Sequence, residues 1–167
     1  AIETNETVGI FGDYDIDGLT ATTLLTDAFS SFGLSVVSHI PNRFIEGYGM
    51  SKEGVDALRK QGASLIVTVD CGSSSVDEID YANSLGLDVI VTDHHSVPKQ
   101  LPKAYALINP HRKNSRYPFK DLAGVGVAFT LVRALQKSFG DEAGLPAGQE
   151  KWLLDLVAFG TVCDVVN

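Results

Sequence analysis

Several features that would mark a special class of protein are scarce or absent in this sequence. It has two cysteines, Cys71 and Cys163, which lie far apart and match neither a disulfide framework nor a CxxC zinc motif. No apolar run approaches the ~20 residues of a membrane-spanning helix, and no segment with the pattern of a signal peptide opens the sequence. We therefore expect a soluble, cytoplasmic protein with no disulfide and no membrane partner.

Positive charge is also scarce. The sequence has 13 lysines and arginines against 21 acidic residues, and its formal net charge is −8. This balance opposes simple electrostatic adhesion to nucleic acid or to an anionic membrane. A substrate that carries phosphate would therefore need cations supplied locally, at its binding site.

The order of apolar segments predicts an α/β fold. Among the 167 residues, apolar runs with β-forming side chains recur at 7–12, 35–40, 64–70, 87–93 and 105–110. The stretches between the first four have helical character, so we expect parallel strands joined by helical crossovers. The continuous apolarity of "LIVTV" and "VIVT" indicates strands covered on both faces. The fold class is therefore a doubly wound, mostly parallel sheet with helices on both faces, followed by helical segments near residues 125–140 and 149–160.

Three of the expected helices carry end signals. They stop at Gly33, Gly62 and Gly86, and glycine is the residue that most often closes a helix. Ser51 stands at the expected start of the second helix as a candidate N-cap. Ser75 stands at the start of the third, with a glutamate three residues later at capping-box spacing.

Side chains that bind metals gather where the predicted strands end. In order along the chain these are Asp13, Asp15, Asp17, Asp70, Asp93, His94 and His95, with Asp164 after the later apolar segment "LVAFGTVC". Because ligands of open parallel sheets bind beyond the carboxyl ends of the strands, we expect these side chains to converge there. The irregular segment 96–124, with four of the six prolines, is expected to cross the site as a long functional loop.

Each of these residues alone has an ordinary explanation. An aspartate after a strand often caps the next helix, and a His-His pair in a loop is usually solvated or hydrogen-bonded. Their convergence favours a metal site, because the carboxylates would repel one another unless cations lay between them. Carboxylate and imidazole ligands without thiolate favour Mn²⁺ or Mg²⁺, with Zn²⁺ and Co²⁺ as alternatives. The number of ligands favours two ions, and such a pair indicates metal-assisted phosphoester hydrolysis.

Four motifs identify a family. "DYDIDG", "VDCG", "TDHH" and "GTVCD", in this order, resemble the motifs of the DHH phosphoesterase superfamily. The segments "IPNRFIEGYGMS", "INPHR" and "YPFKDLAGVGVAF" resemble its RecJ-like branch of single-strand-specific exonucleases. The resemblance runs from about Val8 to Val166 and implies that residues 1–167 form one DHH catalytic domain. It also implies a fragment of a longer chain, whose C-terminal substrate-binding domains are missing here.

The resemblance implies roles for the residues of these motifs. Metal ligands would be Asp15, Asp17, Asp70, His94 and Asp164, with Asp70 as the bridge between two ions and Asp13 as an additional candidate. His95 would join them in catalysis, and Asp93 would orient its motif without binding metal. Many members of the superfamily carry a histidine where this chain has Phe11, so we expect one ion to have a poorer protein shell.

Other motif residues would contact substrate. Arg43, His111 and Arg112 would hold phosphate oxygens, although an isolated arginine is more often a surface charge. Gly124 and Gly126 would bring backbone amides to phosphate, or form a tight helix start without ligand. Tyr48 would stack on a base or anchor its own loop.

The implied function is metal-dependent hydrolysis of single-stranded DNA from its 5′ end. Within the superfamily, the alternative is an enzyme that acts on oligonucleotides, cyclic dinucleotides, pyrophosphate or polyphosphate. A third interpretation is a scaffold that kept the fold and lost catalysis. The presence of the acidic residues and His94 argues against this last interpretation.

Overall fold

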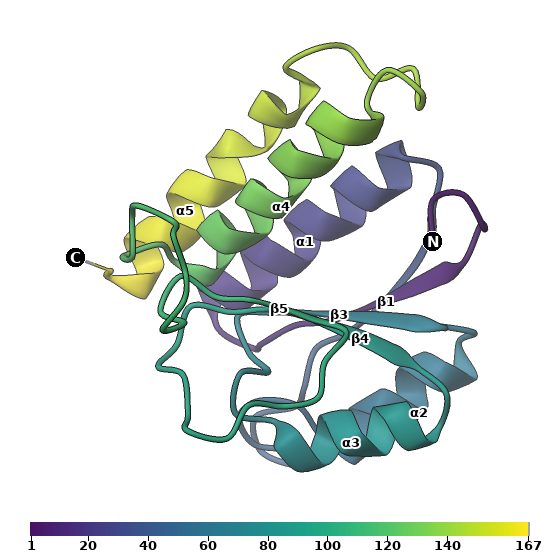
Figure 1. Ribbon diagram of the computed structural model, residues 1–167, viewed down its shortest axis with the longest axis vertical. Helices are drawn as coiled ribbons and strands as arrows, with labels where there is room; N and C mark the ends of the chain where they lie inside the picture. The colour runs from purple at the N-terminus through teal and green to yellow at the C-terminus, as the bar shows by residue number, and fades with distance from the viewer. Residues whose placement is uncertain (167) are drawn as a thin grey trace.

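The computed structural model describes residues 1–166 and contains a five-stranded parallel sheet (Figure 1). The strands are β1 (Thr7–Phe11), β2 (Ser35–His39), β3 (Leu65–Val69), β4 (Asp88–Thr92) and β5 (Ala106–Ile108). Their order is β2-β1-β3-β4-β5, and every neighbouring pair is parallel. All five predicted strands are therefore present.

Helices cover both faces of this sheet (Figure 1). One face carries α1 (Ile16–Ser31), α4 (Gly124–Phe139) and α5 (Leu154–Asp164), and the other carries α2 (Lys52–Lys60) and α3 (Val76–Ser84). This arrangement confirms the predicted fold class. The helical segment expected from residue 149 begins as a 3-10 helix, Gln149–Leu153, before α5. None of the helices in the described part of the chain has the length and apolarity to span a membrane.

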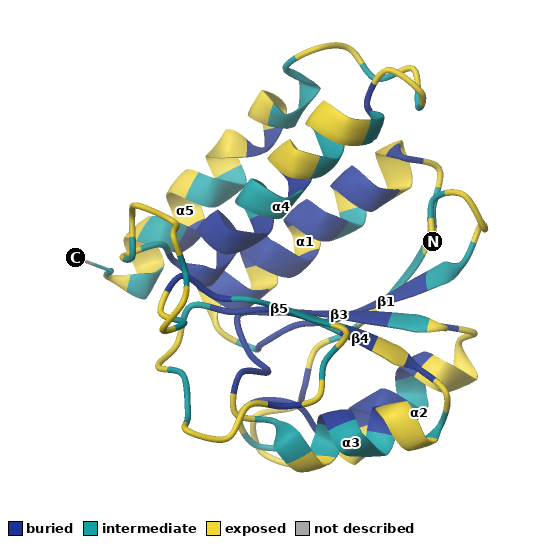
Figure 2. Ribbon diagram, in the orientation of Figure 1, coloured by how far each residue is buried: buried dark blue, intermediate teal, exposed yellow. Residues whose placement is uncertain are grey.

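The strands send their side chains into two separate cores. Val8 and Ile10 of β1 and Val67 of β3 pack with residues of α1 and α4, whereas Phe11 and Ile66 pack with α2 and α3. Successive side chains of a strand point to opposite faces, so neighbouring residues enter different cores. β1 and β3 are accordingly mostly dark blue between the two helical layers in Figure 2, whereas β2 and β5 contain no buried residue. This explains why the strand sequences lack a polar alternation.

The helix ends follow most of the predicted signals. Gly33, Gly62 and Gly86 follow three helices with φ values of 80°, 94° and 78°, a left-handed conformation that glycine adopts without strain. The predicted cap at Ser51 is confirmed, because its hydroxyl accepts a hydrogen bond of 3.1 Å from the amide three residues on. The predicted capping box at Ser75 is wrong. Within the described chain its side chain makes no cap hydrogen bond, and its ψ of 60° is not the extended value of a typical N-cap.

The contact between α2 and the sheet at Gly54 gives a test of this packing. A methyl group on Gly54 would collide with the Phe11 ring and would lie 2.7 Å from His39 Cδ2. Alanine has a higher helix propensity than glycine by about 1 kcal/mol. We nevertheless expect Gly54→Ala to lower the free energy of unfolding by roughly 1–3 kcal/mol, because overpacking a close contact costs about that much.

Urea unfolding measures this change. Glu53→Ala, an exposed position of the same helix, is the matched control and should alter the free energy of unfolding by less than about 0.5 kcal/mol. A Gly54→Ala protein as stable as the parent would contradict the close contact with Phe11 and His39.

Candidate metal centre

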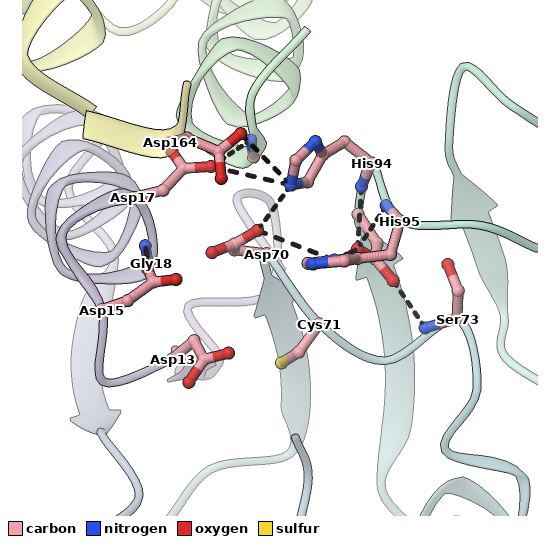
Figure 3. Close-up of polar contacts among 12 residues, drawn as sticks. Asp13, Asp15, Asp17, Gly18, Asp70, Cys71, Ser73, His94, His95 and Asp164 are labelled. Carbon is pink, nitrogen blue, oxygen red and sulfur yellow. Dashed lines mark hydrogen bonds and ion pairs between the residues drawn. The ribbon is translucent and has the colours of Figure 1, made fainter. Parts of the chain in front are cut away.

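The side chains that follow the central strands converge at the carboxyl edge of the sheet (Figure 3). Asp13 and Asp15 follow β1, Asp70 follows β3, and His94 follows β4. Asp164 reaches the same cluster from the end of α5, in the helical layer. Residues separated by up to 151 positions, from 13 to 164, thus share one site.

Asp17, in the first turn of α1, is held by the start of α4. Its two carboxylate oxygens accept hydrogen bonds from the amides of Gly124 at 2.5 Å and Val125 at 2.8 Å. The free amides and the positive end of a helix favour a negative charge at this position. Burial raises the pKa of Asp17, and the two amides partly offset that effect. The first turn of α4 therefore positions a candidate metal ligand.

Asp70 lies at the centre of the cluster. Its backbone is left-handed, with a φ of 60°, and 1% of the residue is exposed. Its Oδ1 lies 3.1 Å from His94 Nε2 and 3.9 Å from His95 Nδ1. Gly124 approaches so closely that a Cβ there would lie 2.6 Å from this oxygen. Burial, together with the charge of Asp17, raises the pKa of Asp70 to about 7.

The imidazole of His94 faces three carboxylates. Its Nε2 lies 3.1 Å from Asp70 Oδ1, 3.8 Å from Asp17 Oδ2 and 3.9 Å from Asp164 Oδ2. Burial lowers the pKa of His94, but the carboxylates of Asp70 and Asp164 outweigh burial, so the pKa is raised overall. A cation among these groups would bind the neutral imidazole through the same nitrogen.

Asp93 holds the polypeptide that carries the two histidines. Its Oδ1 accepts hydrogen bonds from the amides of His94 at 2.8 Å and His95 at 3.1 Å and pairs with His95 Nδ1 at 2.8 Å. Its Oδ2 accepts a hydrogen bond of 2.9 Å from the Ser73 amide. Burial opposes the charge, but these contacts hold the pKa of Asp93 well below its usual range. In return, the bond to Asp93 raises the pKa of His95 to about 9. These contacts support the orienting role predicted for Asp93.

Three groups of side chains present ligand atoms that lie within 4.8 Å of one another. They are Asp13, Asp15 and Asp70; Asp70, His94 and His95; and Asp17, His94 and Asp164. Asp70 and His94 each belong to two groups, so both lie between neighbouring groups of atoms that could hold a cation. The structure therefore brings together all the predicted ligands.

The chemistry of these atoms fits divalent cations. Within residues 1–166, Asp13 Oδ2, Asp70 Oδ1 and His94 Nε2 are buried and have no hydrogen-bond partner. Leaving buried polar atoms without hydrogen bonds is costly, and cations held by the groups above would compensate them. Carboxylate oxygens with one imidazole nitrogen suit hard or borderline ions such as Mn²⁺ and Mg²⁺.

Phe11 occupies the position where many members of the superfamily carry histidine. It is fully buried in the core under α2, with its ring centroid 5.2 Å from that of His39. Asp13, two residues later, instead joins the cluster; it is fully buried and accepts a hydrogen bond of 2.6 Å from the Tyr14 amide. Burial raises the pKa of Asp13, so a cation nearby would favour its ionised form.

The loop between β2 and α2 brings Tyr48 to the cluster and places Arg43 over Tyr14, the residue after Asp13. Arg43 lies over the ring of Tyr14, with its Cζ 5.3 Å from the ring centroid. The Tyr48 hydroxyl lies 3.0 Å from His95 Nε2. Tyr48 thus contacts the site directly, and both alternatives for its role, stacking and anchoring, involve a side chain next to His95.

The other predicted phosphate contacts are placed differently. His111 is exposed, and Arg112 Nη1 donates a hydrogen bond of 2.6 Å to the Leu107 carbonyl of its own segment. The Gly124 amide is bound by Asp17. Gly126 lies in the first turn of α4, where a Cβ would lie 3.1 Å from a side-chain carbon of Leu122. Tight packing at the helix start accounts for both glycines, and phosphate binding by His111 and Arg112 stays a prediction.

Asn109, at the end of β5, has a positioning role that sequence reasoning missed. Its Nδ2 donates hydrogen bonds to Ser73 Oγ at 3.0 Å and to the His95 carbonyl at 2.9 Å, and its Oδ1 accepts one of 2.8 Å from the His111 amide. Asn109 is 4% exposed and so links the segments that follow β3, β4 and β5. The motif "INPHR" contains this asparagine, but its histidine and arginine indicate phosphate binding more strongly than its asparagine indicates a positioning role.

Known proteins are similar to this chain in sequence and in architecture. The model of the DHH family, N-terminal domain, matches residues 7–161. The single-stranded-DNA-specific exonuclease RecJ of Escherichia coli (strain K12) is 48% identical over 163 residues, which are 94% of this chain and 28% of that protein. The protein of the same name from Bacillus subtilis (strain 168) is 43% identical over 166 residues, 99% of this chain and 20% of its own length. The chain thus spans less than a third of either relative.

A solved structure agrees with the sequence comparisons. The crystal structure of exonuclease RecJ bound to manganese has a TM-score of 0.83 and 35% sequence identity, covering 98% of this chain and 40% of the other. Both this structure and the family model cover the strand ends at which the acidic and imidazole groups converge. The chain belongs to the DHH family.

Proposed function

We propose that this chain is the catalytic core of a metal-dependent phosphodiesterase of the RecJ type, which hydrolyses single-stranded DNA with the 5′-to-3′ polarity that the resemblance implies. The observation that carries the proposal is the sharing of Asp70 and His94 between neighbouring groups of ligand atoms. The relatives named above, which are single-stranded-DNA-specific exonucleases, support the substrate class.

The proposed cofactor is a pair of Mn²⁺ or Mg²⁺ ions. Residues that would hold them are Asp15, Asp17, Asp70, His94 and Asp164, with Asp13 as an additional ligand. The RecJ structure bound to manganese supports this choice, as does the donor set of carboxylates and imidazole. When bound, such a pair supplies a nucleophile from water at neutral pH and neutralises charge on the phosphate.

The remaining residues of the site orient the reacting groups. Asp93 holds His95 through Nδ1, and the Tyr48 hydroxyl lies 3.0 Å from Nε2, so His95 would exchange a proton with the substrate through this hydroxyl or in its place. Arg43 is the candidate for a bidentate contact to a non-bridging phosphate oxygen pair. Asn109 positions His95 by donating a hydrogen bond from Nδ2 to the main-chain carbonyl of His95.

We further propose that this catalytic domain works together with other domains of a longer protein. The two curated relatives are more than three times longer than the segment they share with this chain, which leaves room for substrate-binding domains. The free thiols of Cys71 and Cys163 support a reducing, cytoplasmic environment.

The proposed bridge gives the first test. We expect Asp70→Asn to reduce hydrolysis of a short oligodeoxynucleotide in Mn²⁺ by about a thousandfold or more, because a shared ligand holds both ions and several kcal/mol of charge stabilisation depend on them. Chelation of the metal should abolish the parent's activity to the same extent. Asp88→Asn, at an exposed position at the opposite edge of the sheet, is the control and should retain full activity. Retained activity in Asp70→Asn would exclude a bridging role.

The stability of the metal-free protein gives the second test. Burial raises the pKa of Asp70 from its ordinary value near 4 to about 7, so the folded state favours the neutral carboxyl. Its ionisation costs no stability below pH 4, and the cost grows as pH rises toward 7. In chelator, we therefore expect Asp70→Asn to be more stable than the parent at pH 8, by on the order of 4 kcal/mol, and to match it at pH 4.

Urea unfolding at the two pH values measures this difference. Added Mn²⁺ should reverse the order at pH 8, since a ligand that binds the folded state stabilises the parent more than the variant. A metal-free variant that is less stable than the parent at pH 8 would show that Asp70 is held by internal contacts and not by a cation.

A further inference from the structure

The loop between β2 and α2 buries little apolar surface in its central part, residues 42–48. Its large apolar side chains point into solvent, since Phe44 is 95% exposed, Ile45 82% and Tyr48 58%. Gly47 and Gly49, on either side of Tyr48, have left-handed φ values of 81° and 83°, and glycine leaves the backbone many alternative conformations. Hydrogen bonds must therefore supply most of the restraint on this loop.

Glu46 is the centre of those hydrogen bonds. Its Oε1 accepts a bond of 2.9 Å from the Asn42 amide, and its Oε2 accepts one of 2.7 Å from the Ser51 hydroxyl and pairs with His39 Nε2 at 2.8 Å. The side chain is 13% exposed. Burial raises the pKa of Glu46, but these three contacts outweigh burial and lower the pKa overall. Both oxygens of an ionised carboxylate are thus in use.

The three partners of Glu46 belong to different elements. His39 is the last residue of β2, and Asn42 lies in the loop, where its carbonyl also accepts a bond of 2.8 Å from the Glu46 amide. Ser51 caps α2 by accepting a bond of 3.1 Å from the Gly54 amide. One carboxylate therefore joins the end of a strand, a turn and the start of a helix, which closes the loop at its base.

The same loop carries two groups of the proposed site, one on each side of Glu46. The Arg43 guanidinium lies over the ring of Tyr14, and the Tyr48 hydroxyl lies 3.0 Å from His95 Nε2. The candidate metal ligands come from other segments, those that follow β1, β3 and β4 and the end of α5 (Figure 3). The loop therefore sets where Arg43 and Tyr48 lie relative to the ions, whereas the ligand set does not depend on it.

We propose that Glu46 is a positioning residue for the hydrolytic reaction, whose carboxylate holds the loop so that Arg43 and Tyr48 face the metal cluster. Glu46 belongs to none of the groups of ligand atoms among the described residues, and it acts through the loop. The proposal rests on the proposed function, which places a phosphodiester at that cluster. A misplacement of about 1 Å at a reacting group can cost about a hundredfold in rate, so an anchor outside the site matters for catalysis.

The hydrogen-bonding pattern at Glu46 requires a carboxylate. A glutamine has one acceptor oxygen, and its amide nitrogen only donates. If this nitrogen takes the place of Oε1, the Asn42 amide loses its acceptor; if it takes the place of Oε2, the Ser51 hydroxyl loses its own. Glu46→Gln therefore keeps the shape of the side chain and part of the anchor, whereas Glu46→Ala removes the whole anchor.

Hydrogen exchange measures the anchor without any need for activity. The reporter is the Ile45 amide, which donates to the Asn42 carbonyl at 3.0 Å. In metal-free protein we expect this amide to exchange about tenfold faster in Glu46→Gln than in the parent, since one lost hydrogen bond changes a local opening equilibrium by about that factor. The amides of β3 should keep their rates, which shows that the fold is intact. Unchanged exchange at Ile45 would overturn the proposal.

Steady-state hydrolysis of a short oligodeoxynucleotide in Mn²⁺ measures the consequence for catalysis. We expect kcat/KM to fall about tenfold in Glu46→Gln and about a hundredfold in Glu46→Ala. KM should rise because Arg43 is displaced, whereas a smaller folded fraction alone would lower kcat and leave KM unchanged. The affinity for Mn²⁺, measured by calorimetry, should match that of the parent. Glu53→Gln, the same change at an exposed position of α2, is the control and should retain full activity.

The combined results separate this proposal from the proposed function. Full activity in both Glu46 variants, beside an active parent, would refute the positioning role and leave the proposed function intact. A tenfold or greater loss of Mn²⁺ affinity would also refute it, because Glu46 would then support the ligands themselves. A parent without metal-dependent hydrolysis, together with faster exchange at Ile45 in Glu46→Gln, would support the anchor and refute the catalytic role of the chain.

Discussion

The accumulation of negative charge at one end of the sheet is the constraint on which the rest of this structure depends. Asp13, Asp17, Asp70 and Asp93 are each 1% exposed or less, and buried charges are costly unless they are compensated. The fold itself compensates Asp93 through the amides and imidazole that follow β4, and Asp17 through the first amides of α4. Among the described residues, Asp13 Oδ2 and Asp70 Oδ1 accept no hydrogen bond, and cations beside them would supply the missing compensation.

Much of this arrangement follows from local rules that operate on the sequence. Continuous apolar runs predict strands covered on both faces, and parallel strands end at a common edge. Placing an acid or imidazole directly after each of three such runs therefore predicts their convergence, which the positions of Asp13, Asp70 and His94 confirm. The glycines that close three helices were predictable for the same reason, because a left-handed residue is a local requirement.

The rest could not be predicted, because it depends on contacts between distant segments. The bond between Asp17 and Gly124 spans 107 positions, and no periodicity indicates which helix start meets which carboxylate. From its sequence context Asn109 is an ordinary turn residue. Its positioning role becomes evident only when the fold brings Ser73 and His95 to it. The exposure of Phe44 could not be predicted either. A phenylalanine beside another apolar residue is usually buried, and only the folded loop shows that this one is not.

The backbone at Asp70 has a consequence for how the sequence of this site can change over time. Its left-handed φ of 60° is tolerated by aspartate and asparagine far better than by longer or branched side chains. Gly124 also packs directly against this side chain, so a longer one would have to be accommodated beside the start of α4. Asparagine tolerates this backbone conformation but lacks the charge, whereas glutamate carries the charge but tolerates the conformation less well. Neutral drift at this position is therefore blocked on conformational and on chemical grounds at once, so aspartate should persist here even where surrounding residues diverge.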